Sequence, residues 1–295
     1  KMKNRKEMTC LFLYNPNSGK GKLLKKLDYI KQKLCEVYQQ VTIIATESME
    51  DTILKAKLAC GSYDVLAFSG GDGTFNNIVN AVAGEKKRPI LGYIPSGTVN
   101  DIAKNFGISK NIKKALKIIQ KGHVHPFDIG KVNQQYFVYV LALGSFAHVS
   151  YDTDQKIKKK YGKLAYYYKV MKEVLKTNLF HVKIETADHQ ILEMETPLVL
   201  VLNSVSVGGF IVNRKSDIND GKFDVLVMKP GFASGLFNVL LKNKHQKIVT
   251  NQLSISTDSS FDWCIDGEKG MTGQIFVENL QNHLCIFSKK EYKNK

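Results

Sequence analysis

The strongest constraint on the fold is a pattern that recurs over the first 125 or so residues: a short apolar run, a turn of small polar residues, then helical spacing. The apolar runs are Thr9–Tyr14, Val41–Ala45, Val65–Phe68 and Ile90–Ile94. Apolar residues at helical spacing predict helices over Lys22–Tyr38, Asp51–Ala59 and Thr74–Ala83, and another from Asp101. Strands that alternate with helices form a parallel sheet covered on both faces, and ligands of such sheets bind at the carboxyl ends of the strands.

The pattern changes after about His125, where short strand-like runs separated by turn residues take over. These runs are Tyr136–Leu143, His181–Glu185, Leu198–Leu202, Phe223–Met228, Gln252–Ser256, Gln274–Val277 and Leu284–Phe287. They predict a β-sandwich. We therefore expect an α/β protein of two domains, residues 1–127 with a parallel sheet and residues 128–295 with the sandwich, the latter carrying a helical insertion over residues 155–177.

The charge of the chain is strongly positive, with 43 Lys and Arg against 27 Asp and Glu, a net charge of +16. A surface of this charge concentrates anions near the protein. The anionic partner could be nucleic acid, anionic lipid headgroups or nucleotide phosphates. Composition does not choose among them. No helix-turn-helix, zinc-finger or single-strand-binding signature accompanies the charge, which argues against a nucleic-acid-binding regulator.

The cysteines and the apolar segments indicate the cellular compartment of the protein and its relation to the membrane. The five cysteines form no C-x-x-C pair, which favours a reducing compartment over a disulfide framework. The apolar run Cys10–Tyr14 is too short for a signal peptide, and Tyr136–Val149 falls short of the roughly 20 residues that a membrane span needs. We expect a cytoplasmic protein that contacts the inner face of the membrane peripherally.

A glycine-rich turn, Ser69–Thr74, follows a buried strand and opens a helix. Glycines let the backbone approach a phosphate, and the start of a helix directs free N–H groups at an anion. Asp72 would repel a bare phosphate, so Mg²⁺ is expected between them. Alone, such a turn is more often a simple helix cap. The turns Pro95–Asp101 and Asn15–Gly19 occupy equivalent positions, and together the three predict a nucleotide site.

With these turns the sequence resembles the diacylglycerol kinase catalytic domain family, which includes bacterial soluble lipid kinases and, more distantly, sphingosine and ceramide kinases. The resemblance continues through Phe127–Val132, Gly144–Asp152, Ile218–Phe223 and Ile265–Glu268. It implies an active site in a cleft between the two domains and a role for Asp72 and Asp101 with the Mg²⁺ of ATP. The residues that it implies for ATP binding are Asn15, Pro16, Asn17, Ser18, Gly19, Thr46, Gly70, Gly71, Asp72, Gly73, Thr74, Asn76, Thr98, Asn100 and Asp101.

Asp266 and Glu268 are the candidate catalytic acids. Read from the residues alone, Asp266-Gly267 is more simply a hairpin turn, because Asp-Gly is a strong hairpin signal. Phosphoryl transfer to an alcohol nevertheless needs a nearby carboxylate to take its proton. The family resemblance implies that Asp266 is this general base, with Glu268 as the second candidate.

A second, structural metal is implied at the stretch 217–222. From the residues alone this stretch reads as a hairpin loop with two carboxylates. The resemblance implies Mg²⁺ held by Asp220 together with the backbone carbonyls of Asp217 and Lys222, since hard cations prefer oxygen ligands.

The sequence thus predicts a kinase that transfers the γ-phosphoryl group of ATP to a hydroxyl of diacylglycerol or a related lipid, giving phosphatidic acid or its equivalent. A lysine-rich helix near Lys158–Lys160 suits anionic lipid, although a solvated basic face is an equally simple reading. The main alternative is a small-molecule kinase of the NAD kinase or phosphofructokinase type. No nucleic-acid partner is expected, and a homodimer is left open.

Overall fold

A computed structural model describes residues 4–16, 23–97, 100–144, 179–203, 206–207, 210–211, 219–230 and 245–289. The insertion expected over residues 155–177 lies outside the described residues. The chain divides into two compact units. The first unit comprises Lys1–Ile129, Ser206–Asn219 and Gln281–Lys295, and the second comprises Gly130–Val205 and Asp220–Leu280. The predicted domains, residues 1–127 and 128–295, are each continuous in sequence. In the division found here, two later segments of the chain group with the first unit.

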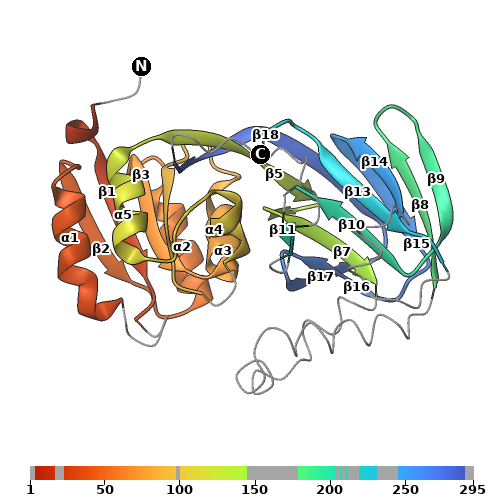
Figure 1. Cartoon of the computed structure of the whole chain (residues 1–295), viewed down its shortest axis with the longest axis horizontal. Coiled ribbons are helices and arrows are strands. Elements are labelled where there is room, and N and C mark those ends of the chain that lie inside the picture. The colour runs from red at the N-terminus through yellow and green to blue at the C-terminus, as the bar shows by residue number, and fades with distance from the viewer. Residues whose placement is uncertain are drawn as a thin grey trace. The chain divides into compact units, whose positions relative to one another are not determined.

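The first unit contains a parallel sheet with the strand order β2-β1-β3-β4-β18 (Figure 1). Its strands are β1 (Thr9–Tyr14), β2 (Gln40–Ala45), β3 (Val65–Gly70), β4 (Ile90–Pro95) and the end of β18 (Ile275–Phe287). Its helices are α1 (Leu27–Cys35), α2 (Met49–Ala59), α3 (Asp72–Val82), α4 (Asp101–Asn105) and α5 (Ile112–Lys121). Smaller elements are the 3-10 turns η1 (Arg5–Glu7) and η3 (Leu24–Lys26) and the hairpin β11 (Ser206–Val207)–β12 (Phe210–Ile211).

The order of these strands contains a topological switch. The chain leaves β1 for β2 on one side and then crosses to β3 on the other side, so β1 and β3 are neighbours. Helices α1 and α5 pack on each other, as do α2 and α3, and the two pairs cover opposite faces of the sheet (Figure 1). In such sheets the crevice at the switch point, outside the carboxyl ends of the strands, is where ligands bind.

The second unit is a sandwich of antiparallel strands. One layer has the strand order β18, β15 (Gln252–Thr257), β8 (Phe180–Thr186) and β9 (Ile191–Thr196). On its other side β18 pairs with β5 (Val124–Val132), which pairs with β6 (Gln135–Phe137). The other layer has the order β14 (His245–Thr250), β13 (Phe223–Met228), β10 (Leu198–Leu202), β7 (Val140–Gly144), β16 (Asp262–Ile265) and β17 (Glu268–Thr272).

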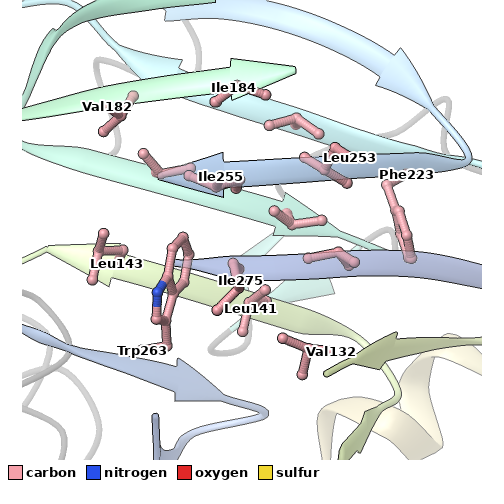
Figure 2. Close-up of a cluster of buried hydrophobic side chains, with 14 of the residues drawn as sticks. Val132, Leu141, Leu143, Val182, Ile184, Phe223, Leu253, Ile255, Trp263 and Ile275 are labelled. Atoms are coloured by element: carbon pink, nitrogen blue, oxygen red, sulfur yellow. The ribbon is translucent and has the colours of Figure 1, made fainter. Parts of the chain in front are cut away.

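The core of this unit lies between the two layers. Val182, Ile184 and Ile255 from one layer face Leu141 and Trp263 from the other, and all five are buried (Figure 2). The indole N–H of Trp263 donates to the carbonyl of Gly273 at 2.9 Å, which satisfies its one polar atom. A Cβ at Gly130 would overlap the ring of Phe137 across the β5–β6 pair, so this position requires glycine.

The predicted α/β fold with a parallel sheet followed by a sandwich is confirmed. Two local predictions are wrong. The run Tyr136–Leu143 is not one strand but parts of β6 and β7, separated at residues 138–139. The runs predicted at 274–277 and 284–287 are not separate strands, because residues 275–277 and 284–287 belong to the single strand β18. Its polar middle resembles a turn in sequence, yet the backbone N–H of Asn282 donates to the buried carboxylate of Asp128 at 2.7 Å. Asn282 itself adopts φ +51°, which asparagine tolerates better than most residues. Among the described residues, no helix has both the length and the apolar character to cross a membrane.

Candidate active site

The two glycine loops of the first unit pack directly against each other. The backbone N–H of Ser96 donates to the carbonyl of Gly70 at 2.8 Å. A Cβ at Gly97 would lie 2.6 Å from the Cα of Gly71, and one at Gly70 would overlap the side chain of Thr74. A side chain at Gly97 would force the two loops apart, and one at Gly70 would displace Thr74 within its own loop. The glycines therefore bring two strand ends, those of β3 and β4, into one surface.

Asp72 ties the loops together more firmly. Its two carboxylate oxygens accept the backbone N–H groups of Asp101 and Ile102, each at 3.1 Å, at the start of α4. Burial raises the pKa of the Asp72 carboxyl above its usual value, and these N–H donors oppose that rise. An ionised carboxylate has about four acceptor sites, so Asp72 retains capacity for a cation.

Asp101 is 2% exposed, and its carboxylate is paired with the ammonium of Lys104 at 2.6 Å. The sequence analysis predicted Asp101 beside Mg²⁺ but did not predict its ion pair with Lys104. The spacing allows this pair, because residues three apart on a helix lie on the same face. Oxygen ligands of this kind suit Mg²⁺, so the donor set at Asp72 and Asp101 fits the expected metal.

Asn100 has a structural role in the second loop. It adopts φ +52°, its amide donates to the carbonyl of Gly97 at 2.6 Å, and its side-chain oxygen accepts the hydroxyl of Tyr93 at 3.4 Å. The side chain is 1% exposed. The side chain of Asn100, which was predicted to bind ATP, thus stabilises the loop through hydrogen bonds within the protein.

A cavity of about 150 Å³ lies at the carboxyl ends of β1, β2 and β3, at the switch point. It brings together three residues predicted for ATP binding, Asn15, Thr46 and Thr74. Gly70, Gly71, Asp72 and Gly73 connect Ser69, on its lining, to Thr74. Asn76, on α3, accepts a hydrogen bond from the amide of Asn80 at 2.9 Å. Pro16 follows Asn15, whereas Asn17, Ser18, Gly19 and Thr98 lie outside the described residues.

In the second unit, Asp266 and Gly267 form the two-residue turn between β16 and β17. Both have positive φ, +49° and +91°, which is the signature of a type I′ turn. The hairpin turn predicted for this dipeptide is therefore present. It does not exclude a chemical role, because a rigid turn also holds a carboxylate in a defined place.

The carboxylate of Asp266 is buried and strongly hydrogen-bonded. It accepts the backbone N–H of Val138 at 2.6 Å, of Tyr139 at 2.9 Å and of Val140 at 3.0 Å. The hydroxyl of Tyr139 donates to the carbonyl of Asp266 at 2.9 Å. These three N–H donors fix the orientation of the carboxylate. The side chain of Glu268, two residues on, is exposed.

Asp220 and Lys222, the described part of the expected structural metal site, lie in a tight turn. The carboxylate of Asp220 accepts the backbone N–H of Lys222 at 3.0 Å, and Gly221 between them has φ +74°. Asp217 lies outside the described residues. Among those that are described, no group of three or more His, Cys, Asp or Glu side chains forms a metal site, but the expected site relies mainly on backbone carbonyls.

Comparisons with known proteins identify the class to which this fold and these loops belong. Residues 9–132 match the model of the diacylglycerol kinase catalytic domain. A crystal structure of a diacylglycerol kinase from Bacillus anthracis superimposes with a TM-score of 0.81 at 28% identity, covering 96% of this chain and 98% of that one. The diacylglycerol kinase of Bacillus subtilis is 35% identical over 95% of this chain and 96% of its own length. That of Staphylococcus carnosus is 32% identical over 96% and 95%.

The chain belongs to the diacylglycerol kinase family, and the predicted family is confirmed. It is accordingly an ATP-dependent kinase that phosphorylates a hydroxyl group. An NAD kinase from Archaeoglobus fulgidus, solved with ATP, has a TM-score of 0.53 at 13% identity. That likeness extends to the fold alone, so the small-molecule kinase alternative has no support beyond it.

Proposed function

We propose that this protein transfers the γ-phosphoryl group of ATP to a hydroxyl of diacylglycerol or a closely related lipid. The observation that carries the proposal is the joined pair of glycine loops at the switch point, held by Asp72. The lipid class follows from the family, whose relatives are named for diacylglycerol. The resemblance in sequence covers nearly the whole chain rather than the nucleotide-binding segment alone.

The residues of the first unit would bind and orient the nucleotide. Backbone N–H groups at the start of α3 suit the phosphates, because the helix start carries partial positive charge. Asp72 and Asp101 would hold Mg²⁺, which neutralises phosphate charge when bound. Asp266 would accept the proton of the lipid hydroxyl, with Glu268 as the second candidate. Placing a carboxylate at that hydroxyl contributes about 10²–10⁴-fold to the rate.

The test is a labelled-ATP assay of pure protein with Mg²⁺ against diacylglycerol, sphingosine, ceramide, phosphatidylglycerol and NAD. Label in diacylglycerol, or in one of the other lipids, is the expected result. Label in NAD and in no lipid would refute the lipid assignment.

We also propose that anionic lipid recruits the protein to the membrane through its basic surface, with Lys158–Lys160 contributing. These lysines lie outside the described residues, and the argument rests on the sequence and its net charge of +16. Each basic residue near an anionic bilayer contributes about 1 kcal/mol. Replacing all three with Ser should weaken cosedimentation with anionic vesicles at least tenfold. Salt should weaken wild-type binding, because charges are screened over ~8 Å at physiological ionic strength.

Neutral phosphatidylcholine vesicles are the control and should bind the wild type and the triple variant equally weakly. Unchanged binding of the triple variant to anionic vesicles would assign the membrane-binding surface to other residues.

We propose that Asp220, with the carbonyls of Asp217 and Lys222, binds a structural Mg²⁺. The variant Asp220→Ala should then lose at least about tenfold in kinase activity while binding Mg-ATP normally. In addition, Mg²⁺ in excess of ATP should activate the wild type but not the variant. Because Asp220 also accepts the N–H of Lys222, Asp220→Asn is the better matched variant, keeping that hydrogen bond but not the charge. Wild-type activity and Mg²⁺ dependence in both variants would eliminate this metal.

A further inference from the structure

The carboxylate of Asp266 is held by a short segment that belongs to no strand. Val138 and Tyr139 lie between the end of β6 and the start of β7. In its layer β7 lies between β10 and β16, so the residues that directly follow these two strands flank the segment. Those residues are Asn203 after β10 and Asp266 after β16. Asn203 and Asp266 therefore lie on opposite sides of the same segment.

Each of two successive peptide groups joins Asn203 to Asp266. The carbonyl of Val138 accepts the side-chain amide of Asn203 at 3.0 Å. The N–H of that peptide group, which belongs to Tyr139, donates to Oδ1 of Asp266 at 2.9 Å. In the next peptide group, the carbonyl of Tyr139 accepts the backbone N–H of Asn203 at 3.1 Å, and the N–H of Val140 donates to the same Oδ1 at 3.0 Å. Two parallel chains of hydrogen bonds therefore run from Asn203 to one oxygen of the carboxylate.

The side chain of Asn203 has a defined orientation in a buried place. Its N–H₂ group faces the carbonyl of Val138, and its oxygen accepts the side-chain amide of Asn279 at 3.4 Å. A flipped amide would set two acceptors against each other at Val138. Asn203 is 2% exposed and Asp266 is 4% exposed. In such surroundings a hydrogen bond to the carbonyl of a peptide group strengthens the N–H donor at the other end of that group.

These chains act on the carboxylate of Asp266 more than on its main chain. The main chain is held separately, because its N–H donates to the carbonyl of Val140 at 2.9 Å and its carbonyl accepts the hydroxyl of Tyr139. By contrast, two of the three N–H groups that hold the carboxylate belong to peptide groups bonded to Asn203. Loss of the Asn203 side chain should leave the hairpin in place and loosen the carboxylate.

A general base must lie within hydrogen-bond reach of the proton that it takes, and a misplacement of about 1 Å can cost about 10²-fold in rate. We propose that Asn203 is a positioning residue for phosphoryl transfer, which keeps the carboxylate of Asp266 in the orientation that proton transfer from the lipid hydroxyl requires. This inference rests on the proposed function, because it assigns Asn203 a role only through Asp266.

The test begins with Asn203→Leu, which keeps the approximate size and shape of the side chain but removes its hydrogen bonds. The backbone N–H of residue 203 still bonds Tyr139, so one of the two chains remains. The kcat should fall about ten- to 100-fold, with the KM for ATP within about threefold of wild type, because the nucleotide-binding loops are unchanged.

The same substitution in Asp266→Asn protein separates positioning from a general loss of stability. If Asn203 acts through the carboxylate, its replacement should change the residual kcat of Asp266→Asn by less than about twofold. Thr196→Val is the matched control. It removes a fully buried hydroxyl that bonds the carbonyl of Met228 at 2.8 Å near the other end of β10. This control should lower thermal stability and leave kcat unchanged.

Asn203→Ala serves if the leucine variant does not fold. A smaller loss of kcat than expected, or the same fractional loss in the wild-type and Asp266→Asn backgrounds, would overturn the inference. An equal loss of kcat in Thr196→Val would overturn it as well. Wild-type kcat in Asp266→Asn, or wild-type protein that phosphorylates no lipid, would instead overturn the proposed function.

Discussion

Replacing Asp266 with Asn should lower kcat about 10²–10⁴-fold, the usual contribution of general-base catalysis, with the KM for ATP within about threefold of wild type. The amide cannot accept the proton of the lipid hydroxyl, whereas the nucleotide-binding loops are untouched. The turn itself should survive, because Asn-Gly is as favourable as Asp-Gly in a type I′ turn. One of the three N–H donors, that of Val138, would face an amide N–H₂ rather than an oxygen. This mismatch should cost about 1–3 kcal/mol of folding free energy.

The measurement is a steady-state comparison at a temperature well below the thermal midpoint of each variant. Asp262→Asn is the matched control, because it removes the same charge from the same hairpin and breaks only a 2.8 Å ion pair with the exposed Lys269. Glu268→Gln identifies the base: a larger loss there than in Asp266→Asn would transfer the role to Glu268. Retention of more than about a tenth of wild-type kcat in Asp266→Asn would contradict the role proposed for Asp266.

Asp72→Asn should reduce kcat/KM for Mg-ATP at least about 100-fold, because metal charge stabilisation is worth several kcal/mol and each 1.4 kcal/mol is tenfold. The apparent affinity for Mg²⁺ at fixed ATP should fall with it. The same change puts an amide N–H₂ against one of the two backbone N–H groups at the start of α4, so some loss of stability is expected. Titration of Mg²⁺ separates the two effects, since lost stability alone does not alter metal dependence in the folded fraction.

Asp64→Asn controls for the structural part of this effect. Asp64 directly precedes β3 and its carboxylate accepts the backbone N–H of Thr9 at 2.9 Å. It therefore makes the same kind of bond at the opposite end of the same strand, and its loss should lower stability with little change in Mg²⁺ dependence. An Asp72→Asn protein with wild-type Mg²⁺ dependence would contradict the assignment of Asp72 to the metal.

The parts of the fold that could be predicted are those with strong local periodicity. The strands and helices around Gly70 and Gly97 were readable because a buried apolar run, a glycine turn and a helix follow one another within a few residues. Strand β18 was not readable, because its polar middle is explained only by the distant carboxylate of Asp128. Nor does the sequence show that the end of this strand pairs with β4. The paired residues, Ile286 and Leu91, lie far apart in the sequence.

The candidate site likewise combines features that the sequence predicts with contacts that only the structure shows. Sequence identified the loops and the acids, but not what each side chain contacts. The contacts of Lys104 with Asp101 and of Asn100 with Gly97 are local, three residues apart, and the first follows from helix spacing. The convergence of the N–H groups of residues 138–140 on Asp266 depends instead on tertiary structure. The sequence marked Ser69 only as the first residue of the glycine-rich turn, whereas the structure shows that its hydroxyl is buried without a hydrogen-bond partner among the described residues.

The most direct test of lipid kinase activity is a competition experiment. Pure protein is given Mg-ATP together with equal concentrations of dispersed diacylglycerol and NAD, and the phosphorylated products are identified by phosphorus NMR and mass spectrometry. The proposed function predicts phosphatidic acid, formed in step with ADP and lost in Asp266→Asn. Phosphorylated NAD without phosphorylated lipid, or ADP release without any phosphorylated acceptor, would contradict it.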